Sequence, residues 1–240
     1  MSRQLIRPDR FFFGTRSLPC PYVRGKTERK VVTDLSGPDA NELYERLSQA
    51  GFRRSHNVAY RPACPKCVDC VPVRIVASDF IWTRSFRRVV RNNKDLKADD
   101  IEAIATIEQY RLFSEYQRQR HQGGEMSGMG YDDYRAMIED TPVSSRTVEF
   151  RDKAGRLNGV MLMDRMEKSL SAVYSFFNTT VSERSLGTYM ILWMVEQAHS
   201  LSLPHVYLGY WITGSEKMAY KARFQPLETL GLNGWKAQKN

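Results

Sequence analysis

The sequence lacks the features of membrane-spanning and secreted proteins. No apolar run in its 240 residues reaches the roughly 18 residues that a helix needs to cross a bilayer. The segment from Met1 to Arg10 has no apolar core followed by a small-residue cleavage site, so it is not a secretory signal. We therefore expect a cytoplasmic protein with no membrane partner. In that reducing compartment, the four cysteines favour metal binding or free thiols over disulfides.

Acidic residues are scarce in the first part of the chain. Residues 1–97 contain 20 Lys and Arg against 9 Asp and Glu, a net charge of +11. Residues 98–240 contain 16 against 18, a net charge of −2, and the two values add up to the +9 of the whole chain. A basic front half beside a nearly neutral remainder predicts a polyanionic partner, with RNA or DNA foremost. The alternative is a charge that serves only solubility.

Three of the four cysteines lie in one proline-rich loop. Cys64, Cys67 and Cys70 have the spacing C-x2-C-x2-C, and Cys20, between two prolines, would be the fourth ligand. Four thiolates suit Zn²⁺ or an iron–sulfur cluster, and the tight run is more typical of the cluster. The alternative is a set of four buried free thiols. The centre, if present, is not needed for the transfer chemistry considered below.

Arginines are concentrated just after this loop, beside Trp82 and Phe86. The set expected to contact nucleic-acid phosphates is Arg84, Arg87, Arg88 and Arg91. The same run indicates a join between two domains. We expect a basic, cysteine-bearing N-terminal domain over residues 1–85, a basic connector over 86–100 and a second domain over 101–240.

The second domain combines helical and alternating patterns, which predicts an α+β fold. Residues 98–121 and 131–139 are expected to be helical. Strands are expected at 147–151, 157–163, 170–177 and 206–211, with a helix over 185–201 before the last strand. This order resembles the N-acetyltransferase-like (GNAT) fold. There, a conserved glycine-containing helix start holds the diphosphate of coenzyme A, but here Tyr189 stands where a small residue is usual, which argues against that cofactor.

The stretch 203–226 reads as a buried strand that is interrupted at Gly209 and followed by a short basic helix capped by Ser215. Period two places Val206, Leu208 and Tyr210 on one face of the strand. Gly209 leaves bare backbone among aromatic residues, where another group can approach closely.

This stretch also carries a family resemblance. It is similar to the signature of the aminoacyl-tRNA–protein transferases, whose bacterial branch comprises the aspartate/glutamate leucyltransferases. The matching residues are Tyr207 to Ile212, Ser215, Lys217, Met218, Tyr220, Lys221, Phe224 and Pro226. Further matches are the spaced cysteines, Arg53-Arg54-Ser55, Arg120-His121 and Ser185 to Tyr189, so the resemblance covers about residues 14 to 235. It implies a GNAT-like acyltransferase domain with the small cysteine-bearing domain packed on it.

The resemblance implies transfer of leucine from Leu-tRNA to proteins with an N-terminal Asp or Glu. The product would be a degradation signal for downstream proteolysis machinery. Such a reaction is the aminolysis of an ester and requires no cofactor. The rival hypotheses are a coenzyme A-dependent N-acetyltransferase and a non-enzymatic, metal-bearing RNA-binding module. The residues alone do not decide between leucine and arginine as the donor amino acid.

We assign candidate roles in this reaction to residues near the glycine break and in the second domain. Gly209 would offer a backbone N–H to the oxyanion, and Tyr210 or Tyr220 would relay a proton. The cations expected to pair with the acceptor carboxylate are Arg120, Lys217 and Lys221. His121, Tyr189 and Phe176 complete the expected substrate-binding set, with Phe176 lining an apolar space for leucine. His121 is more readily explained as structural than as a base.

Overall fold

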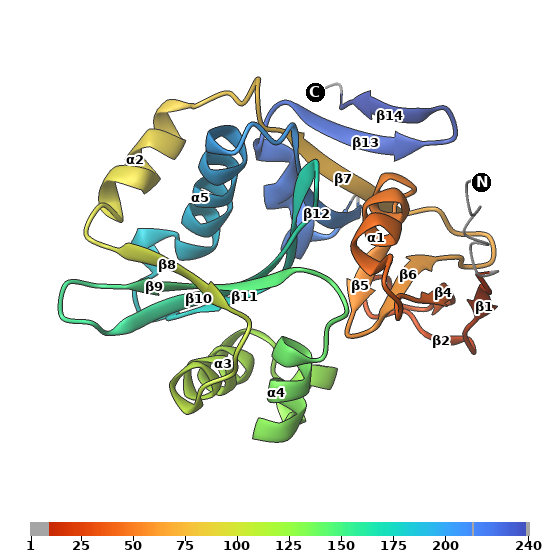
Figure 1. The fold of residues 1–240 in the computed structure, drawn as a ribbon, viewed down its shortest axis with the longest axis horizontal. Coiled ribbons are helices and arrows are strands. Elements are labelled where there is room, and N and C mark those ends of the chain that lie inside the picture. The colour runs from red at the N-terminus through yellow and green to blue at the C-terminus, as the bar shows by residue number, and fades with distance from the viewer. Residues whose placement is uncertain (1–9, 213, 239–240) are drawn as a thin grey trace, which may run out of the picture.

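One eight-stranded sheet organises most of the molecule (Figure 1). The computed structural model describes residues 10–212 and 214–238, without the side chains of Glu125, Glu216 and Lys217. In spatial order the strands are β14 (Gly234–Ala237), β13 (Leu227–Gly231), β7 (Cys70–Val76), β12 (His205–Ile212), β11 (Ser169–Phe177), β10 (Leu157–Arg165), β9 (Ser145–Arg151) and β8 (Lys97–Glu102). Among the described strands of this sheet, β11 and β12 alone run parallel, and helix α5 (Leu186–Ser200) connects them.

Helices cover both faces of this sheet (Figure 1). Helix α5 lies on one face beside α2 (Arg84–Asn92), whereas α3 (Ile107–Arg120) and α4 (Tyr131–Glu139) lie on the other. Each face has its own apolar core, one centred on α5 and one on the aromatic residues of α3, α4 and β11. In the described part of the chain, no helix combines the length and apolarity required to cross a membrane.

The N-terminal part forms a smaller unit beside the large sheet (Figure 1). Its four-stranded sheet has the order β1 (Phe13–Gly14), β4 (Lys30–Asp34), β6 (Val58–Pro62) and β5 (Arg53–Ser55). A two-stranded sheet joins β2 (Leu18–Pro19) to β3 (Thr27–Glu28), and helix α1 (Ala40–Gln49) packs between the two units. Short helical turns occur at Glu125–Gly128, Ser182–Arg184, α6 (Glu216–Ala219) and Tyr220–Arg223.

A buried ion pair joins the two units. Arg54 on β5 donates to both carboxylate oxygens of Asp164 on β10, at 2.9 and 2.8 Å. Both side chains are almost completely buried, with 1% and 0% exposure. The hydroxyl of Ser145 also donates to this carboxylate, at 2.5 Å, so the buried charges are fully hydrogen-bonded.

The predicted α+β class and GNAT-like element order are confirmed, and the strands and helix expected at 147–211 all form. The prediction of a helix over 98–121 is wrong at its start. Residues 97–102 form the edge strand β8, in which Asp100 binds Arg146 and Arg165, both at 2.7 Å. The helix begins only at Ile107, after a capping box in which Thr106 accepts from Gln109 N.

Candidate active site

The glycine break in β12 is a β-bulge. The pairing register of β12 with β7 shifts between Tyr207 and Gly209, and Gly209 has a φ of +74°. The extra residue reverses the side-chain alternation beyond it, so the prediction that Tyr210 shares a face with Val206 and Leu208 is wrong. Val206 and Leu208 enter the core under α5, whereas Tyr210 turns toward the N-terminal unit.

The hydroxyl of Tyr210 binds the N-terminal unit. It donates to the carbonyl oxygens of Gly51 and Tyr60, at 3.0 and 3.1 Å. Burial raises the pKa of Tyr210 well above its ordinary value. A hydroxyl that is buried, bonded to two carbonyls and hard to ionise serves as an anchor between the units, so this geometry favours Tyr220 over Tyr210 as the proton relay.

Strands β11 and β12 diverge next to the bulge. In the described residues their pairing ends at Ser171↔Tyr207, which leaves an opening that we call the strand fork. Separated strands leave carbonyl groups that need new donors. On the β11 side, Nη2 of Arg53 donates to the carbonyls of Ala172 and Val173, at 3.1 and 3.0 Å.

A buried lysine satisfies the β12 side of the fork. Nζ of Lys221 donates to the carbonyls of Leu208 and Tyr210, at 2.8 and 2.6 Å, and the residue is only 6% exposed. Burial, with a smaller effect of the Arg53 charge, lowers the pKa of Lys221 to about 7, whereas its two carbonyl bonds favour the ammonium form. Lys221 was expected to pair with the acceptor carboxylate; the structure places it inside, holding the bulge.

An aromatic and basic group of side chains stands near the fork. The ring of Tyr116 on α3 lies 5.0 Å from that of Phe177 and 5.4 Å from that of His121. Tyr220 is 40% exposed; burial raises its pKa, and the charge of Arg53 lowers it. Arg120 is exposed, and its charge acts on Tyr116. The structure thus brings Tyr220 and the fork within electrostatic range of one another, with Arg120 and His121 beside Tyr116.

Three predicted substrate-binding residues are placed elsewhere or not described. Tyr189 is buried under the sheet, with its ring 5.7 Å from that of Phe150. Phe176 is fully buried on the opposite face of the sheet, in the α3–α4 core. The side chain of Lys217 lies outside the described part of the structure. At the start of α5 it is Phe177, not Tyr189, that closes the space over Gly187, where a Cβ would lie 3.0 Å from its ring.

The arginine run forms the solvent side of helix α2. All four predicted tRNA-binding residues, Arg84, Arg87, Arg88 and Arg91, are exposed. Their helix is linked to the fork region, because the ring of Phe86 stacks 5.1 Å from that of Phe224, and Arg223 lies over Phe86 at 5.7 Å. The basic helix and the segment that carries Tyr220 and Lys221 are therefore packed together.

The four cysteines are gathered at the outer end of the N-terminal unit, all half-buried. Backbone N–H groups of Val23 and Arg29 point at the sulfurs of Cys20 and Cys64, both at 3.4 Å. Burial, and then the charges of the other three cysteines, raise the pKa of Cys70 to about 11, so all four lie within electrostatic range. Among the described residues, no group has metal-ligating geometry.

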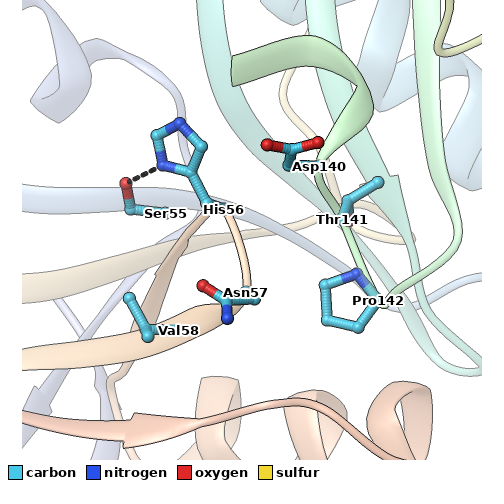
Figure 2. Close-up of a pocket in the computed structure, with 7 residues that line it drawn as sticks. All are labelled: Ser55, His56, Asn57, Val58, Asp140, Thr141 and Pro142. Atoms are coloured by element: carbon cyan, nitrogen blue, oxygen red, sulfur yellow. Dashed lines mark hydrogen bonds between the residues drawn. The ribbon is translucent and has the colours of Figure 1, made fainter. Parts of the chain in front are cut away.

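A separate hollow of about 670 Å³ lies between the turn after β5 and the loop after α4. Figure 2 shows the ring of His56 and the carboxylate of Asp140 on its opposite walls. Nδ1 of His56 is hydrogen-bonded to the hydroxyl of Ser55, at 3.2 Å. None of the residues that line it carries a role predicted from the sequence, so the fork is the candidate active site.

Sequence reasoning missed Arg53, the residue that enters the fork. The sequence did contain a signal. Arg53 and Arg54 are consecutive residues of a short strand, so their side chains point to opposite faces, and one of them is turned toward each side. Both sides are covered here: Arg54 binds Asp164, and Arg53 lies against Gly209.

Two models of one known protein family match separate parts of the chain. The family model described as "Arginine-tRNA-protein transferase, C terminus" matches residues 108–231, and the corresponding N-terminal model matches residues 18–88. Both describe enzymes that transfer an amino acid from a tRNA to a protein. The chain belongs to the arginine-tRNA-protein transferase family.

Relatives within this family resemble the chain over nearly its whole length. An aspartate/glutamate leucyltransferase of Paramagnetospirillum magneticum is 57% identical over 97% of this chain and 95% of that protein. One of Rhodospirillum rubrum is 55% identical over 98% of this chain and 96% of that protein. Among solved structures, that of FemX aligns with 79% of this chain and 65% of that chain, with a TM-score of 0.48 and 8% identity.

Proposed function

We propose that this chain transfers leucine from Leu-tRNA to the N-terminal Asp or Glu of acceptor proteins. The observation that carries the proposal is the near-complete similarity, at 55–57% identity, to proteins named aspartate/glutamate leucyltransferase. The fork supplies the chemical setting, because it combines a bulged strand, fixed cations and phenols at the point where two parallel strands separate.

The reaction replaces an ester bond with an amide bond. The acceptor's α-amine attacks the carbonyl carbon of leucine, and the 3′ ribose oxygen leaves with a proton. An α-amine has a pKa of about 7.7–8.0, so roughly a tenth of it is already deprotonated at pH 7 and little further deprotonation work is needed. The protein's contribution is then mainly to hold amine and ester together and to exclude water. We assign the return of a proton to the ribose oxygen to Tyr220, because this phenol is 40% exposed and its raised pKa keeps it protonated.

The arginine face of α2 is proposed to bind the tRNA. Arg84, Arg87, Arg88 and Arg91 are exposed and form no ion pair with the side chains that the structure describes. Free guanidinium groups on one helix are suited to phosphate contacts. Phe86 packs this helix on Phe224, which lies three residues after Lys221 in the chain.

A transfer assay tests the proposal. Purified protein is mixed with an Asp-starting peptide and either labelled Leu-tRNA or labelled Arg-tRNA, and transfer to the peptide is measured. We expect leucine transfer to exceed arginine transfer and to fail with a peptide whose N-terminus is acetylated. Binding of tRNA without any transfer to peptide would contradict the proposal and favour an RNA-binding role.

The cysteine centre is proposed to hold Zn²⁺ or an iron–sulfur cluster for structural support. Its donor set has the right chemistry for such a group, since Cys20, Cys64 and Cys67 all act electrostatically on Cys70 and backbone N–H groups point at two of the sulfurs, although the four thiols are not in ligating geometry. Metal analysis and thermal unfolding of Cys67→Ser test this. We expect lower metal content and a lower Tm; a variant that keeps full stability with no bound metal would contradict a structural role.

The biological consequence is proposed as well. A leucine added to an acidic N-terminus replaces a charged first residue with an apolar one, which downstream proteolysis machinery would then recognise. A reporter that starts with Asp should be degraded in cells that contain this protein and should persist when the reporter's N-terminus is blocked.

A further inference from the structure

Arg53 is a mostly buried cation without an acidic partner in the described part of the chain. It forms no ion pair there, and its described hydrogen bonds both start from Nη2 and end at backbone carbonyls. A guanidinium has five N–H groups, so those of Nε and Nη1 keep their donor capacity. Burying a charge is costly unless it is paired, so such a group is suited to an anionic ligand.

Among the described residues, the groups that act most strongly on Arg53 are not acidic. The titratable groups that act on it most strongly are the tyrosines at positions 22, 44, 60 and 210. Tyrosines are neutral near pH 7. The other charged group of the fork is Lys221, which is bonded to backbone carbonyls. The fork therefore contains two cations whose described partners are all uncharged.

The backbone around Arg53 fixes the guanidinium in place. A Cβ at position 209 would lie 2.5 Å from Cζ and 2.7 Å from Nε of Arg53, so the group lies flat in the space that the glycine leaves free. Ala172 and Val173 hold its other edge. The side chain retains solvent contact, and its charge reaches Tyr220 on the outer side of the fork.

We propose that Arg53 is the residue that binds the side-chain carboxylate of the acceptor's N-terminal Asp or Glu. The proposal rests on the proposed function and names the group that makes the enzyme select acidic N-termini. The carboxylate would accept N–H bonds from Nη1 while Nη2 keeps its bonds to β11. This places the acceptor's α-amine at the strand fork, beside the segment that carries Tyr220.

The position of the Arg53 guanidinium favours a carboxylate over a tRNA phosphate as its ligand. Phosphates of a nucleic acid are met by several exposed cations, and the chain has such a set on α2. Arg53, in contrast, is one mostly buried cation whose position is fixed by Gly209 on one side and by the β11 carbonyls on the other. Such a site suits one small anion that binds in a defined orientation. An acidic side chain leaving water needs such a partner.

The test compares two peptides that differ only in the first residue, Asp or its near-isosteric amide Asn. For the wild type we expect kcat/KM to be higher for the Asp peptide. In Arg53→Gln the Asp peptide should lose roughly 10- to 150-fold in kcat/KM, the range for a charge-assisted pair, while the Asn peptide changes little. The ratio of the two peptides should approach one, with KM for Leu-tRNA unchanged.

The neighbouring arginine provides a matched control. Arg54→Lys should lower the Tm, because Arg54 is buried against Asp164, but it should leave the Asp:Asn ratio at the wild-type value. If Arg53→Gln keeps the wild-type ratio, the proposal is overturned. If it instead raises KM for Leu-tRNA with the ratio intact, Arg53 binds the donor's phosphate and the proposal is equally overturned.

A second measurement uses the wild-type protein and does not depend on how well Arg53→Gln folds. The NMR signal of the Arg53 Nε–H group, assigned by its absence in Arg53→Lys, is followed while each peptide is added. We expect it to shift with the Asp peptide and not with the Asn peptide; no shift with either overturns the proposal. Leucine transfer by the wild type is scored separately, so a failure of the proposed function is distinguishable from a failure of this inference.

Discussion

Replacing Gly209 by alanine should be far more damaging than an ordinary glycine-to-alanine change. Gly209 has a φ of +74°, and holding an alanine in that conformation costs about 1–2 kcal/mol. The new Cβ would also lie 2.5 Å from Cζ of Arg53, so the guanidinium must leave its position. Losing its bonds to Ala172 and Val173 costs about 1.5–3 kcal/mol more. We therefore expect a total loss of about 2.5–5 kcal/mol in the free energy of unfolding.

The chain offers a matched control for the conformational part of this cost. Gly234, the first residue of β14 after its turn from β13, has a φ of +87°, and a Cβ there would meet nothing within 4 Å. Gly234→Ala should therefore cost only about 1–2 kcal/mol. Urea unfolding followed by circular dichroism gives both values, and their difference isolates the contact between Gly209 and Arg53.

A double-mutant cycle then tests the assignment of that difference. In an Arg53→Ala background the guanidinium is absent, so Gly209→Ala should cost no more than Gly234→Ala does. The reasoning is refuted if Gly209→Ala and Gly234→Ala are equally mild in the wild-type background. It is also refuted if the extra cost of Gly209→Ala persists after Arg53 has been removed.

Three further predictions concern charges. Asp164→Asn should cost about 3–5 kcal/mol in urea unfolding, because it leaves Arg54 buried without a counterion. The pKa of Lys221 is lowered on folding, so above pH 7 the unfolded chain binds more protons than the folded chain. The free energy of unfolding of the wild type, relative to that of Lys221→Met, should therefore rise between pH 7 and pH 9.5, by at most about 1.4 kcal/mol per pH unit. A difference that does not depend on pH would contradict this. Replacing Arg87 and Arg88 by Gln should weaken Leu-tRNA binding and reduce the slope of log K against log salt by roughly 1.5, measured by filter binding.

The sequence predicted those parts of the fold that depend on periodicity. The hairpin β9–β10, strand β11, helix α5 and strand β12 have strong period-two or helical patterns, and each forms within a few residues of the expected bounds. Edge strand β8 was missed because its acidic residues are equally suited to a first helical turn. The strand is stabilised instead by its pairing with β9 and by the ion pairs of Asp100 with Arg146 and Arg165.

The candidate site depended on features that no local pattern contains. The glycine in β12 was recognised as a place of close approach, but the approaching group, Arg53, comes from 156 positions earlier in the chain. The bulge also changed the face on which Tyr210 lies. A strand pattern predicts alternation, whereas one inserted residue reverses it, and only the pairing with β7 shows where that happens.

The N-terminal and C-terminal regions of the chain both contribute to the large sheet and to the strand fork. Strand β7 follows the cysteine loop in sequence, yet it lies between β12 and β13 in the large sheet. The N-terminal unit also supplies Arg53, which satisfies carbonyls that the diverging strands leave without partners. A sheet opened to admit a substrate has unpaired backbone groups at its fork, and these need donors that do not close it. The side chains of Arg53 and Lys221, one from each region, meet that need by donating to carbonyls on the two sides of the fork.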